Sequence, residues 1–309
     1  MIEVEELRKQ YGDLMAVDGV SFRAEEGTIF GLLGPNGAGK STTIGCISGL
    51  LSPTSGRVRV LGADVVRESA RAKAALGVVP QDLALYEDLS ARDNLSYWGA
   101  AYGLAGRQLR ERVDEVLDRV GLGGRAREPV KRFSGGMKRR LNLACGVVHR
   151  PRVLLLDEPT VGVDPQSRVR LIELVREEVA AGTCVLYTTH YMEEAQELCD
   201  RIAIVDRGQV IAHGTLAELR GLLGERDLVR LSGSFDEARV RAALGTVGEV
   251  EVVNLTDDQL MLAAVGASRE LPAIFGALAE AGADVRETTL SQPSLESLFI
   301  KLTGRELRE

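Results

Sequence analysis

The fold class is decided by the stretch Gly34-Pro35-Asn36-Gly37-Ala38-Gly39-Lys40-Ser41, which has the G-x-x-x-x-G-K-[ST] form of a phosphate-binding loop. An apolar, strand-like run at residues 28–33 precedes the loop, and Thr42 follows it in a helical pattern. Glycines let backbone N–H groups approach a polyphosphate without clashes from Cβ atoms, and the N-terminus of the next helix favours an anion. Residues 34–42 are therefore predicted to bind a nucleoside triphosphate.

Two side chains of the loop suit a triphosphate and its metal ion. Lys40 can reach the β- and γ-phosphates, and the Ser41 hydroxyl can hold Mg²⁺. A flexible glycine-rich turn without a ligand would explain the glycines. It would explain neither the strand-like run before them nor the helical pattern after them.

A pair of acidic residues follows the apolar run at 153–156. Asp157 stands at the C-terminal end of this predicted strand, where it can hold Mg²⁺ through water. Glu158 can then polarise the attacking water as a general base. An apolar run that ends in Asp-Glu is also common where a strand leaves the core, but the phosphate-binding loop upstream favours the functional interpretation.

Composition and charge set the broad class. The chain has 309 residues, of which 45% are hydrophobic and 27% charged, so we expect a globular protein of two domains. The formal net charge is −7, so the chain as a whole has no basic footprint and we expect no nucleic-acid partner, although local basic patches stay open at this stage. The cysteines are scattered, which predicts buried free thiols. No apolar run approaches about 18 residues, so we expect no membrane-spanning segment.

The pattern around the loop predicts an α/β core. Runs at 76–79, 153–156 and 184–187 are apolar on both faces, which is typical of buried parallel strands with helices between them. Alternating residues in 1–33 add an antiparallel β layer. Residues 82–150 carry helical patterns and almost no strand signal. We predict a helical subdomain there, inserted in a domain that spans 1–220.

A second domain is predicted at 227–309, after a linker at 221–224. Its pattern gives a strand, a helix, two strands, a helix and a strand in that order, with one more helix at the end. This βαββαβ order predicts a small α+β domain of ferredoxin-like type. The predicted strands are 228–231, 250–253, 259–265 and 285–290, and the predicted helices are 236–244, 271–281 and 294–302.

The run Phe133-Ser134-Gly135-Gly136-Met137 is a second candidate anion site. It lies just before a helical pattern, so the Ser134 hydroxyl and the exposed N–H groups of Gly135 and Gly136 can meet a phosphate. An ordinary helix cap is the alternative, since serine and glycine commonly start helices.

In combination, these motifs resemble the ATP-binding cassette (ABC) ATPases. The motifs occur in the order of that family, and the resemblance covers residues 1 to about 220. They are the phosphate-binding loop 34–41, Gln81, the signature 133–137, Asp157-Glu158, the segment 161–164 and His190. The resemblance implies a P-loop NTPase cassette that binds ATP with Mg²⁺ and hydrolyses it.

The resemblance also assigns roles to single residues. Tyr11 is expected to stack on adenine, Gln81 to sense the γ-phosphate and contact the permease, and His190 to act as a switch near the γ-phosphate. The expected catalytic residues are Lys40, Glu158 and His190, and the expected Mg²⁺ ligands are Ser41, Gln81 and Asp157. The expected nucleotide-binding residues are Tyr11, Gly34, Pro35, Asn36, Gly37, Ala38, Gly39, Lys40, Ser41, Thr42, Gln81, Ser134, Gly135, Gly136 and Asp164. His149 and His213 lack a matching context and are interpreted as structural or surface groups.

Two positions depart from the family pattern. Met137 stands where the signature more often ends in Gln, and Val161 replaces a frequently polar residue. The variant signature, the segment 158–165 and the tail 294–299 resemble the drug-export ATPases of the daunorubicin-resistance group, which serve separate ABC-2 type permeases.

The function implied by the resemblance is that of a motor subunit of a membrane exporter, at the cytoplasmic face of the cell membrane. Two copies would face head to tail, so that Ser134–Gly136 of one copy caps ATP on the other. Residues 82–95 are the expected docking surface, and Tyr86, Leu89, Tyr97 and Trp98 are the expected apolar anchors. Core packing is the alternative for Tyr97 and Trp98, whereas docking is favoured for Tyr86 and Leu89.

Two other functions remain open at this stage. A soluble ABC ATPase that acts on nucleic acid or ribosomes is disfavoured by the single cassette and the acidic charge. A regulatory nucleotide-binding module without hydrolysis does not explain why Glu158 and His190 are both present.

Overall fold

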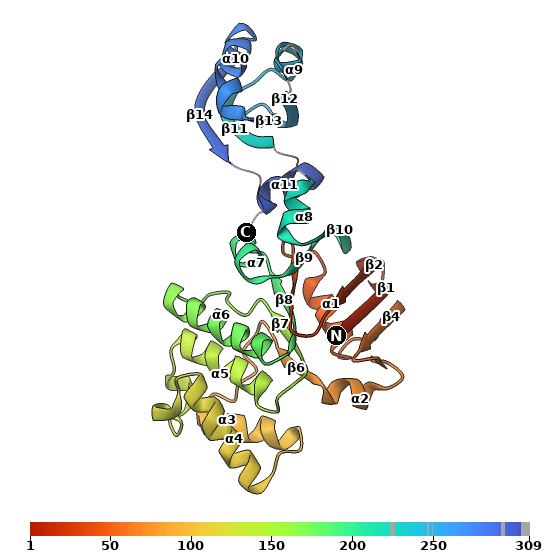
Figure 1. Ribbon diagram of the computed structural model, residues 1–309, viewed down its shortest axis with the longest axis vertical. Coiled ribbons are helices and arrows are strands. Elements are labelled where there is room, and N and C mark those ends of the chain that lie inside the picture. The colour runs from red at the N-terminus through yellow and green to blue at the C-terminus, as the bar shows by residue number, and fades with distance from the viewer. Residues whose placement is uncertain (223–225, 246, 249, 292–293, 304–309) are drawn as a thin grey trace. The chain divides into compact units, whose positions relative to one another are not determined.

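The computed structural model describes residues 1–222, 226–245, 247–248, 250–291 and 294–303. The chain divides into two compact units, residues 1–213 and 214–309 (Figure 1). Among the described residues, no helix combines the length and apolarity needed to cross a membrane.

The main sheet of unit 1 has the strand order β10-β9-β3-β8-β7-β6. The pairs of β3 with β8 and β9, and of β7 with β6 and β8, are parallel. The strands are β3 (Ile29–Leu33), β6 (Leu76–Val79), β7 (Val153–Asp157), β8 (Cys184–Thr189), β9 (Arg201–Asp206) and β10 (Gln209–Gly214). This arrangement confirms the α/β core that the apolar runs predict.

Both faces of this sheet are buried, and the strand alternation divides its side chains between two cores. Leu154 and Leu156 of β7 pack with the helical side, whereas Val153 and Leu155 pack with the antiparallel layer. This explains the continuous apolar run of the sequence, since a strand covered on both faces has no polar positions.

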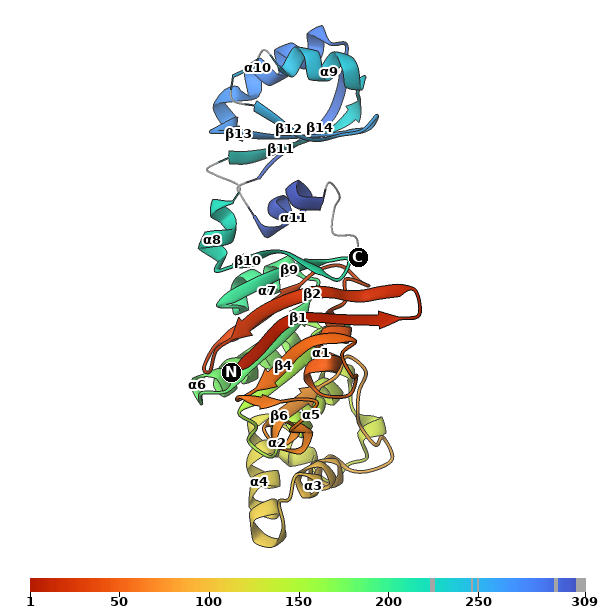
Figure 2. The same ribbon diagram turned by 90° about the vertical axis from the view of Figure 1, so that its right-hand side faces the viewer.

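An antiparallel sheet of order β2-β1-β4-β5 forms the second layer of unit 1, and Figure 2 shows β1, β2 and β4 side by side. Its strands are β1 (Ile2–Tyr11), β2 (Leu14–Ala24), β4 (Ser55–Val60) and β5 (Ala63–Asp64). Its apolar face packs with α1 (Lys40–Ile47) and the main sheet in one core. A short helix, α2 (Ser69–Ala74), follows β5.

The chain between β6 and β7 is helical and contains no strand among its described residues. It holds α3 (Ala91–Ala101), α4 (Gly106–Arg119), two short 3₁₀ helices (Gly123–Arg125 and Val130–Arg132) and α5 (Gly135–Val147). Ser90 and Asp93 form a capping box at the start of α3. After β7 come α6 (Pro165–Ala180) and α7 (Met192–Leu198).

Unit 2 has the predicted βαββαβ order, on an antiparallel sheet of order β12-β13-β11-β14. One face packs with α9 and α10, and the other packs against Ile300 of the last helix. The elements are α8 (Leu216–Gly221), β11 (Arg226–Ser234), α9 (Glu237–Leu244), β12 (Val250–Leu255), β13 (Gln259–Val265), α10 (Ala267–Glu280), β14 (Asp284–Ser291) and α11 (Leu295–Thr303).

Among the boundaries that differ from the sequence prediction, two depend on contacts with distant residues. The division falls between 213 and 214 rather than at 220, because α8 contacts α11 within unit 2. Helix α10 begins at Ala267, four residues before the predicted start at 271. The backbone N–H of Ala267 donates to Asp227 (3.1 Å), a partner 40 residues away that a local pattern does not reveal.

Candidate functional site

The topology brings the predicted motifs to one edge of the main sheet. Strands β3, β8 and β7 are neighbours, with Leu33 beside Thr189 and Asp157 beside Thr188. The C-terminal ends of parallel strands meet at the same edge, where α/β proteins bind their ligands. The phosphate-binding loop, Glu158 and His190 directly follow these three ends.

Glycine is required at two positions of the loop. A Cβ on Gly34 would lie 2.2 Å from the carbonyl oxygen of Val205. A Cβ on Gly39 would lie 2.4 Å from that of Ala16, and Gly39 has a left-handed φ of 99° where it caps α1. Neither position has room for a Cβ atom. Because glycine has none, the loop can adopt this conformation, in which backbone N–H groups can turn inward.

A pocket of about 500 Å³ lies over the start of α1. It brings together four predicted components: Tyr11, the loop, Gln81 and Glu158. Its full lining is Tyr11, Leu14, Ala16, Asn36, Gly37, Ala38, Gly39, Lys40, Ser41, Thr42, Gln81 and Glu158. The predicted residues Gly34, Pro35, Ser134, Gly135, Gly136, Asp157, Asp164 and His190 are outside this lining.

Leu14 and Ala16 are pocket residues that the sequence analysis missed. The hairpin of β1 and β2 pairs Tyr11 with Leu14, so the two side chains belong to the same end of the antiparallel layer. Leu14 is 66% exposed although it is apolar. Only the pairing register, which the sequence does not state, places this part of the hairpin beside the loop.

Lys40, Glu158 and His190 form one buried cluster. The Lys40 ammonium lies 3.0 Å from Glu158 Oε1 and also donates to the carbonyl oxygens of Gly34 (2.7 Å) and Pro35 (3.0 Å). His190 Nδ1 lies 3.1 Å from Glu158 Oε2, and the Gln81 amide reaches the same oxygen at 3.5 Å. The three predicted catalytic residues therefore meet at the Glu158 carboxylate.

The Glu158 carboxylate is held in its ionised form. Burial acts to raise its pKa, but hydrogen bonds and charge from Lys40, and then from His190, outweigh burial and lower it below the ordinary value. Glu158 also has a left-handed φ of 44°, and its N–H donates to the Thr188 hydroxyl (3.0 Å). Strained backbone of this kind is concentrated at functional sites.

The side chains near the loop include the kinds of oxygen ligand that would suit Mg²⁺. Ser41, Gln81 and Asp157 offer a hydroxyl, an amide oxygen and a carboxylate, and Mg²⁺ prefers oxygen ligands. The buried Asp157 is oriented by the Thr188 hydroxyl, which donates to its Oδ1 at 2.7 Å. The described residues contain no group of three or more His, Cys, Asp or Glu that could hold a metal ion by themselves.

The signature residues Ser134–Gly136 form the N-terminus of α5. The exposed Ser134 caps the helix and accepts from the N–H of Met137 at 3.3 Å, as the helix-cap alternative expects. The Sδ of Met137 accepts from the Arg125 guanidinium (3.2 Å), so this departure from the family pattern has a partner within the chain. A Cβ on Gly136 would lie 2.0 Å from Ser167 Oγ, so α5 packs closely on the start of α6.

Helix α5 also binds the two loops that flank the site. Arg139 donates to the carbonyl oxygens of Gln81 and of Val161, the latter at 3.1 Å. Asn142 is buried, donates to Pro80 O (3.3 Å) and accepts from the N–H of Ala84 (3.1 Å). The segment around Gln81 is thus fixed to the helix that begins with the signature.

Asp164 caps α6, and its Oδ1 accepts from the N–H of Ser167 at 2.9 Å. Hydrogen bonds from the Ser167 backbone, and then from the Ser167 side chain, lower the pKa of Asp164.

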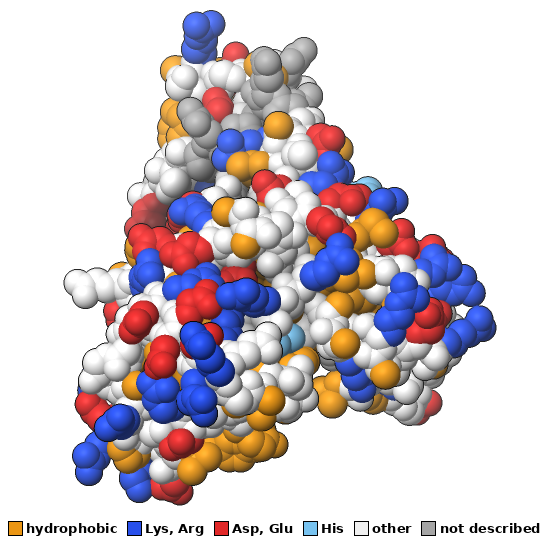
Figure 3. Space-filling model, turned by 60° about the horizontal axis from the view of Figure 1, so that its bottom comes forward, with side chains coloured by type: hydrophobic (Ala, Val, Ile, Leu, Met, Phe, Trp, Pro, Cys, Tyr) orange, Lys and Arg blue, Asp and Glu red, His pale blue; other side chains and the backbone are white. Residues whose placement is uncertain are grey.

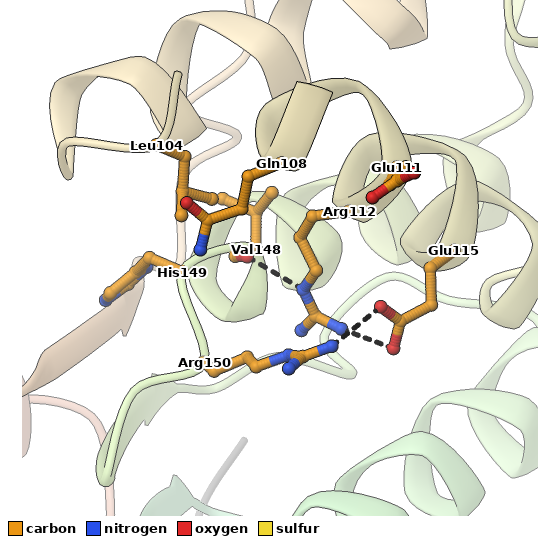
Figure 4. Close-up of a pocket in the computed structure, with 8 residues that line it drawn as sticks. All are labelled: Leu104, Gln108, Glu111, Arg112, Glu115, Val148, His149 and Arg150. Atoms are coloured by element: carbon orange, nitrogen blue, oxygen red, sulfur yellow. Dashed lines mark hydrogen bonds and ion pairs between the residues drawn. The ribbon is translucent and has the colours of Figure 1, made fainter. Parts of the chain in front are cut away.

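His149 and His213 lie away from the nucleotide pocket. The ring of His149 stacks on Tyr102, with 3.5 Å between ring centroids, and its Nε2 lies 2.9 Å from Leu76 O. His149 also borders a separate pocket of about 380 Å³, in which Arg112 and Arg150 face Glu115 (Figure 4). These charges pair with each other at 2.7 and 2.9 Å. His213 is exposed on β10.

The predicted docking residues divide into two groups. Tyr86, Leu89 and Tyr97 are 46%, 42% and 50% exposed, and the rings of Tyr86 and Tyr97 meet edge to face at 5.1 Å. Trp98 instead packs against the helical core, as the alternative for this residue expects. Figure 3 shows hydrophobic side chains gathered on the lower part of the face that it presents.

Residues 17–161 match the family described as ABC transporter. A linearmycin resistance ATP-binding protein of Bacillus subtilis is 43% identical over 312 residues, which cover 100% of this chain and 100% of that protein. A daunorubicin/doxorubicin resistance ATP-binding protein of Streptomyces peucetius is 40% identical over 304 residues, with 98% of this chain and 92% of the relative covered.

Solved structures show the same fold for unit 1. An ATP-binding subunit of an ABC transporter matches with a TM-score of 0.67 at 32% identity, over 72% of this chain and 93% of that chain. The dimeric, post-hydrolysis state of an ATP-binding cassette bound to ADP and Pi matches with a TM-score of 0.64 at 25% identity. That match covers 70% of this chain and 99% of the other.

Proposed function

The chain belongs to the ABC transporter family of ATP-binding subunits, and from this premise we propose that it is the motor of an ABC-2 type exporter whose permease is a separate chain. Members of this family bind and hydrolyse ATP, and this chain is an ATPase of that kind. The observation that carries the proposal is the pocket that combines Tyr11, the loop, Gln81 and Glu158.

In the proposed site, the triphosphate lies on the loop and the adenine lies against Tyr11, beside Leu14 and Ala16. Mg²⁺ would be held by Ser41, Asp157 and Gln81, where it would neutralise phosphate charge. Lys40 is now paired with Glu158, and a phosphate would compete with that carboxylate for the ammonium. Glu158 would then be free to accept a proton from the attacking water, while His190 orients Glu158 and meets the γ-phosphate.

We propose that the site is completed by a second copy of the chain. Ser134, Gly135 and Gly136 are outside the pocket lining, and Ser134 and Gly135 are exposed at a helix N-terminus that suits an anion. A dimeric cassette bound to ADP and Pi is among the similar structures, which supports a paired arrangement. ATP held by one copy would be capped by Ser134–Gly136 of the other.

The permease is proposed to dock on Tyr86, Leu89 and Tyr97, which we call the aromatic patch. Exposed aromatic and aliphatic side chains of this kind are typical anchors of interfaces. The patch lies C-terminal to Gln81 in the chain, and α5 holds the segment around Gln81 through Arg139 and Asn142. Docking would therefore place the subunit at the cytoplasmic face of the membrane and connect the permease to the ATP site.

The relatives support export of an antibiotic or drug. Two of the similar proteins are resistance proteins for linearmycin and for daunorubicin/doxorubicin, and both match this chain over nearly its full length, including unit 2. We propose the same class of cargo for this chain.

Affinity purification from solubilised membranes of the native host tests the docking proposal. The Glu158→Gln chain, loaded with ATP, is expected to retain a membrane protein with many spanning segments. Tyr97→Glu should lose that partner, because it places a charge in the aromatic patch. Val66→Glu is the matched control, since Val66 is exposed (62%) and lies outside the patch. Retention of RNA or ribosomes instead would support the nucleic-acid alternative and contradict the proposal.

A further inference from the structure

Glu194 is a fully buried carboxylate to which the proposed reaction assigns no role. It lies in the first turn of α7 with 0% exposure. Its Oε1 accepts from the Thr160 hydroxyl (2.6 Å) and lies 2.9 Å from Arg168 Nε. Its Oε2 accepts from the hydroxyls of Tyr187 (3.1 Å) and Thr189 (2.8 Å). A buried charge is costly unless it is paired and hydrogen-bonded, and Glu194 has four such partners.

The partners of Glu194 flank both members of the Glu158–His190 pair. Thr160 comes two residues after Glu158, and Thr189 directly precedes His190. The Thr189 hydroxyl also accepts from the N–H of Tyr191 (2.9 Å), so it fixes the backbone on both sides of His190. One carboxylate therefore holds the segment that carries the proposed general base and the segment that carries the proposed switch histidine.

Arg168 extends this connection to α6. Its guanidinium pairs with Glu194 and lies 5.5 Å from the ring centroid of Tyr191. The Tyr191 ring in turn packs against His190, with 4.1 Å between ring centroids. Since α6 is capped by Asp164, the segment 161–164 has a direct structural path to His190.

We propose that Glu194 is a positioning residue of the ATPase reaction, which keeps Glu158 and His190 at their mutual distance of 3.1 Å. Glu194 is outside the lining of the nucleotide pocket, so it acts through its partners, of which Thr160, Thr189 and Arg168 connect it to the pair. The inference rests on the proposed roles of Glu158 and His190. It goes further by naming what fixes their geometry.

Replacement of Glu194 by Gln tests the inference. Gln has nearly the same size, but it loses the charge that pairs with Arg168 and presents N–H groups to hydroxyl donors. We expect kcat for ATP hydrolysis to fall about tenfold to a hundredfold, because small misplacements of catalytic groups have effects of this size. The Kd for ATP should change by less than about threefold, since the loop and Tyr11 are untouched.

The matched control is Glu178→Gln. Glu178 is also buried on a helix and paired with an arginine, Arg119 at 2.7 Å, but it contacts neither segment of the catalytic pair. Both variants are expected to unfold at a lower temperature than the wild type. Only Glu194→Gln should lower kcat when both are assayed well below their melting temperatures. Equal kcat values in the two variants would overturn the inference.

Thr160→Val provides a second route that does not alter the buried charge. It removes one hydroxyl donor at constant volume, and it should lower kcat with little change in Kd. Its effect should not add to that of Glu194→Gln, because both act on the same contact. Full additivity would contradict the inference. If Glu158→Gln and His190→Ala themselves retain wild-type rates, the proposed catalytic roles fail; if only Glu194→Gln does, the positioning role alone fails.

Discussion

At the scale of single residues, the Glu158 carboxylate is the centre of the site. Lys40 and His190 each bind one of its oxygens, and these contacts keep its pKa low despite burial. An ionised carboxylate at this position can accept a proton as soon as a phosphate draws Lys40 away. These contacts with Lys40 and His190 take the place of water in stabilising the charge of the buried Glu158 side chain.

Replacement of Glu158 by Gln should therefore separate binding from chemistry. The amide cannot accept a proton, so kcat should fall by about a hundredfold or more, which is the usual contribution of a general base. The Kd for ATP should stay close to that of the wild type, because Tyr11 and the loop are unchanged. Equilibrium binding of a fluorescent ATP analogue and a phosphate-release assay measure the two quantities. Wild-type turnover in the variant would refute the assignment.

His149 predicts a pH dependence of stability that is unrelated to catalysis. Burial lowers its pKa below the ordinary value of 6.5, and its buried Nδ1 has no hydrogen-bond partner. A lowered pKa in the folded state means that the unfolded chain binds the proton more readily. The stabilisation is therefore complete above the unfolded pKa, near 6.5, and is lost as the pH falls below it.

His149→Gln should flatten that dependence. Gln can still donate to Leu76 O but does not titrate, so its melting temperature should vary less than that of the wild type between about pH 7.5 and 5.5. Thermal denaturation at several pH values measures the two slopes. Replacement of the exposed His213 is the control, and it should leave the wild-type slope unchanged. Identical slopes for the wild type and His149→Gln would contradict the role of His149.

At the scale of elements, α5 joins the parts of the site. Its first turn carries Ser134–Gly136, Gly136 contacts Ser167 at the start of α6, and Arg139 binds the carbonyl oxygen of Gln81. Movement of the segment around Gln81 would therefore shift α5 and, with it, the position of the signature. This arrangement supports the proposed coupling between the aromatic patch and the ATP site.

Gly136→Ala should weaken the contact between α5 and α6. The added Cβ would lie 2.0 Å from Ser167 Oγ, so the helices must separate, and we expect a loss of about 1–3 kcal/mol in the free energy of unfolding. Gly135→Ala is the control, because no atom lies within 4 Å of its added Cβ. Urea denaturation compares the two variants. Equal stability would show that α6 does not restrict position 136.

The sequence predicts the motif-bearing parts of the site better than the contacts between them. Lys40 and Glu158 were expected because each occurs within a recognisable local pattern, whereas Tyr11 and Gln81 were expected from the family resemblance. The structure brings all four into one pocket. Glu194 could not be predicted, since its partners lie up to 34 residues away and only the fold assembles them.

As with the site, the sequence predicts the elements of the fold that have local signals and misses those that depend on tertiary contacts. The α/β cassette core and the βαββαβ order follow from hydrophobic periodicity and turn residues, which are local signals. The start of α10 and the place of α8 depend on tertiary partners, Asp227 and α11. Such partners are set by packing rather than by local preference, so the pattern missed both.

At the scale of the whole molecule, the exposed signature supports the proposal that a second copy of the chain completes the ATP site. One copy contains the loop, Glu158 and His190, but its Ser134–Gly136 segment is outside the pocket. Two copies related by a two-fold axis would complete two sites at once, since each would give its signature to the other. Binding of ATP would then be coupled to association.

The most direct test of this account is the molar mass of the Glu158→Gln chain in solution, with and without ATP and Mg²⁺, measured by light scattering after size-exclusion chromatography. We predict a monomer without nucleotide and a dimer with ATP. The dimer should be lost in Glu158→Gln/Ser134→Trp, which still binds ATP, and kept in Glu158→Gln/Ser52→Trp, where the exposed Ser52 lies outside both the pocket and the signature. A chain that binds ATP and yet remains monomeric, or a dimer that survives Ser134→Trp, would contradict the account.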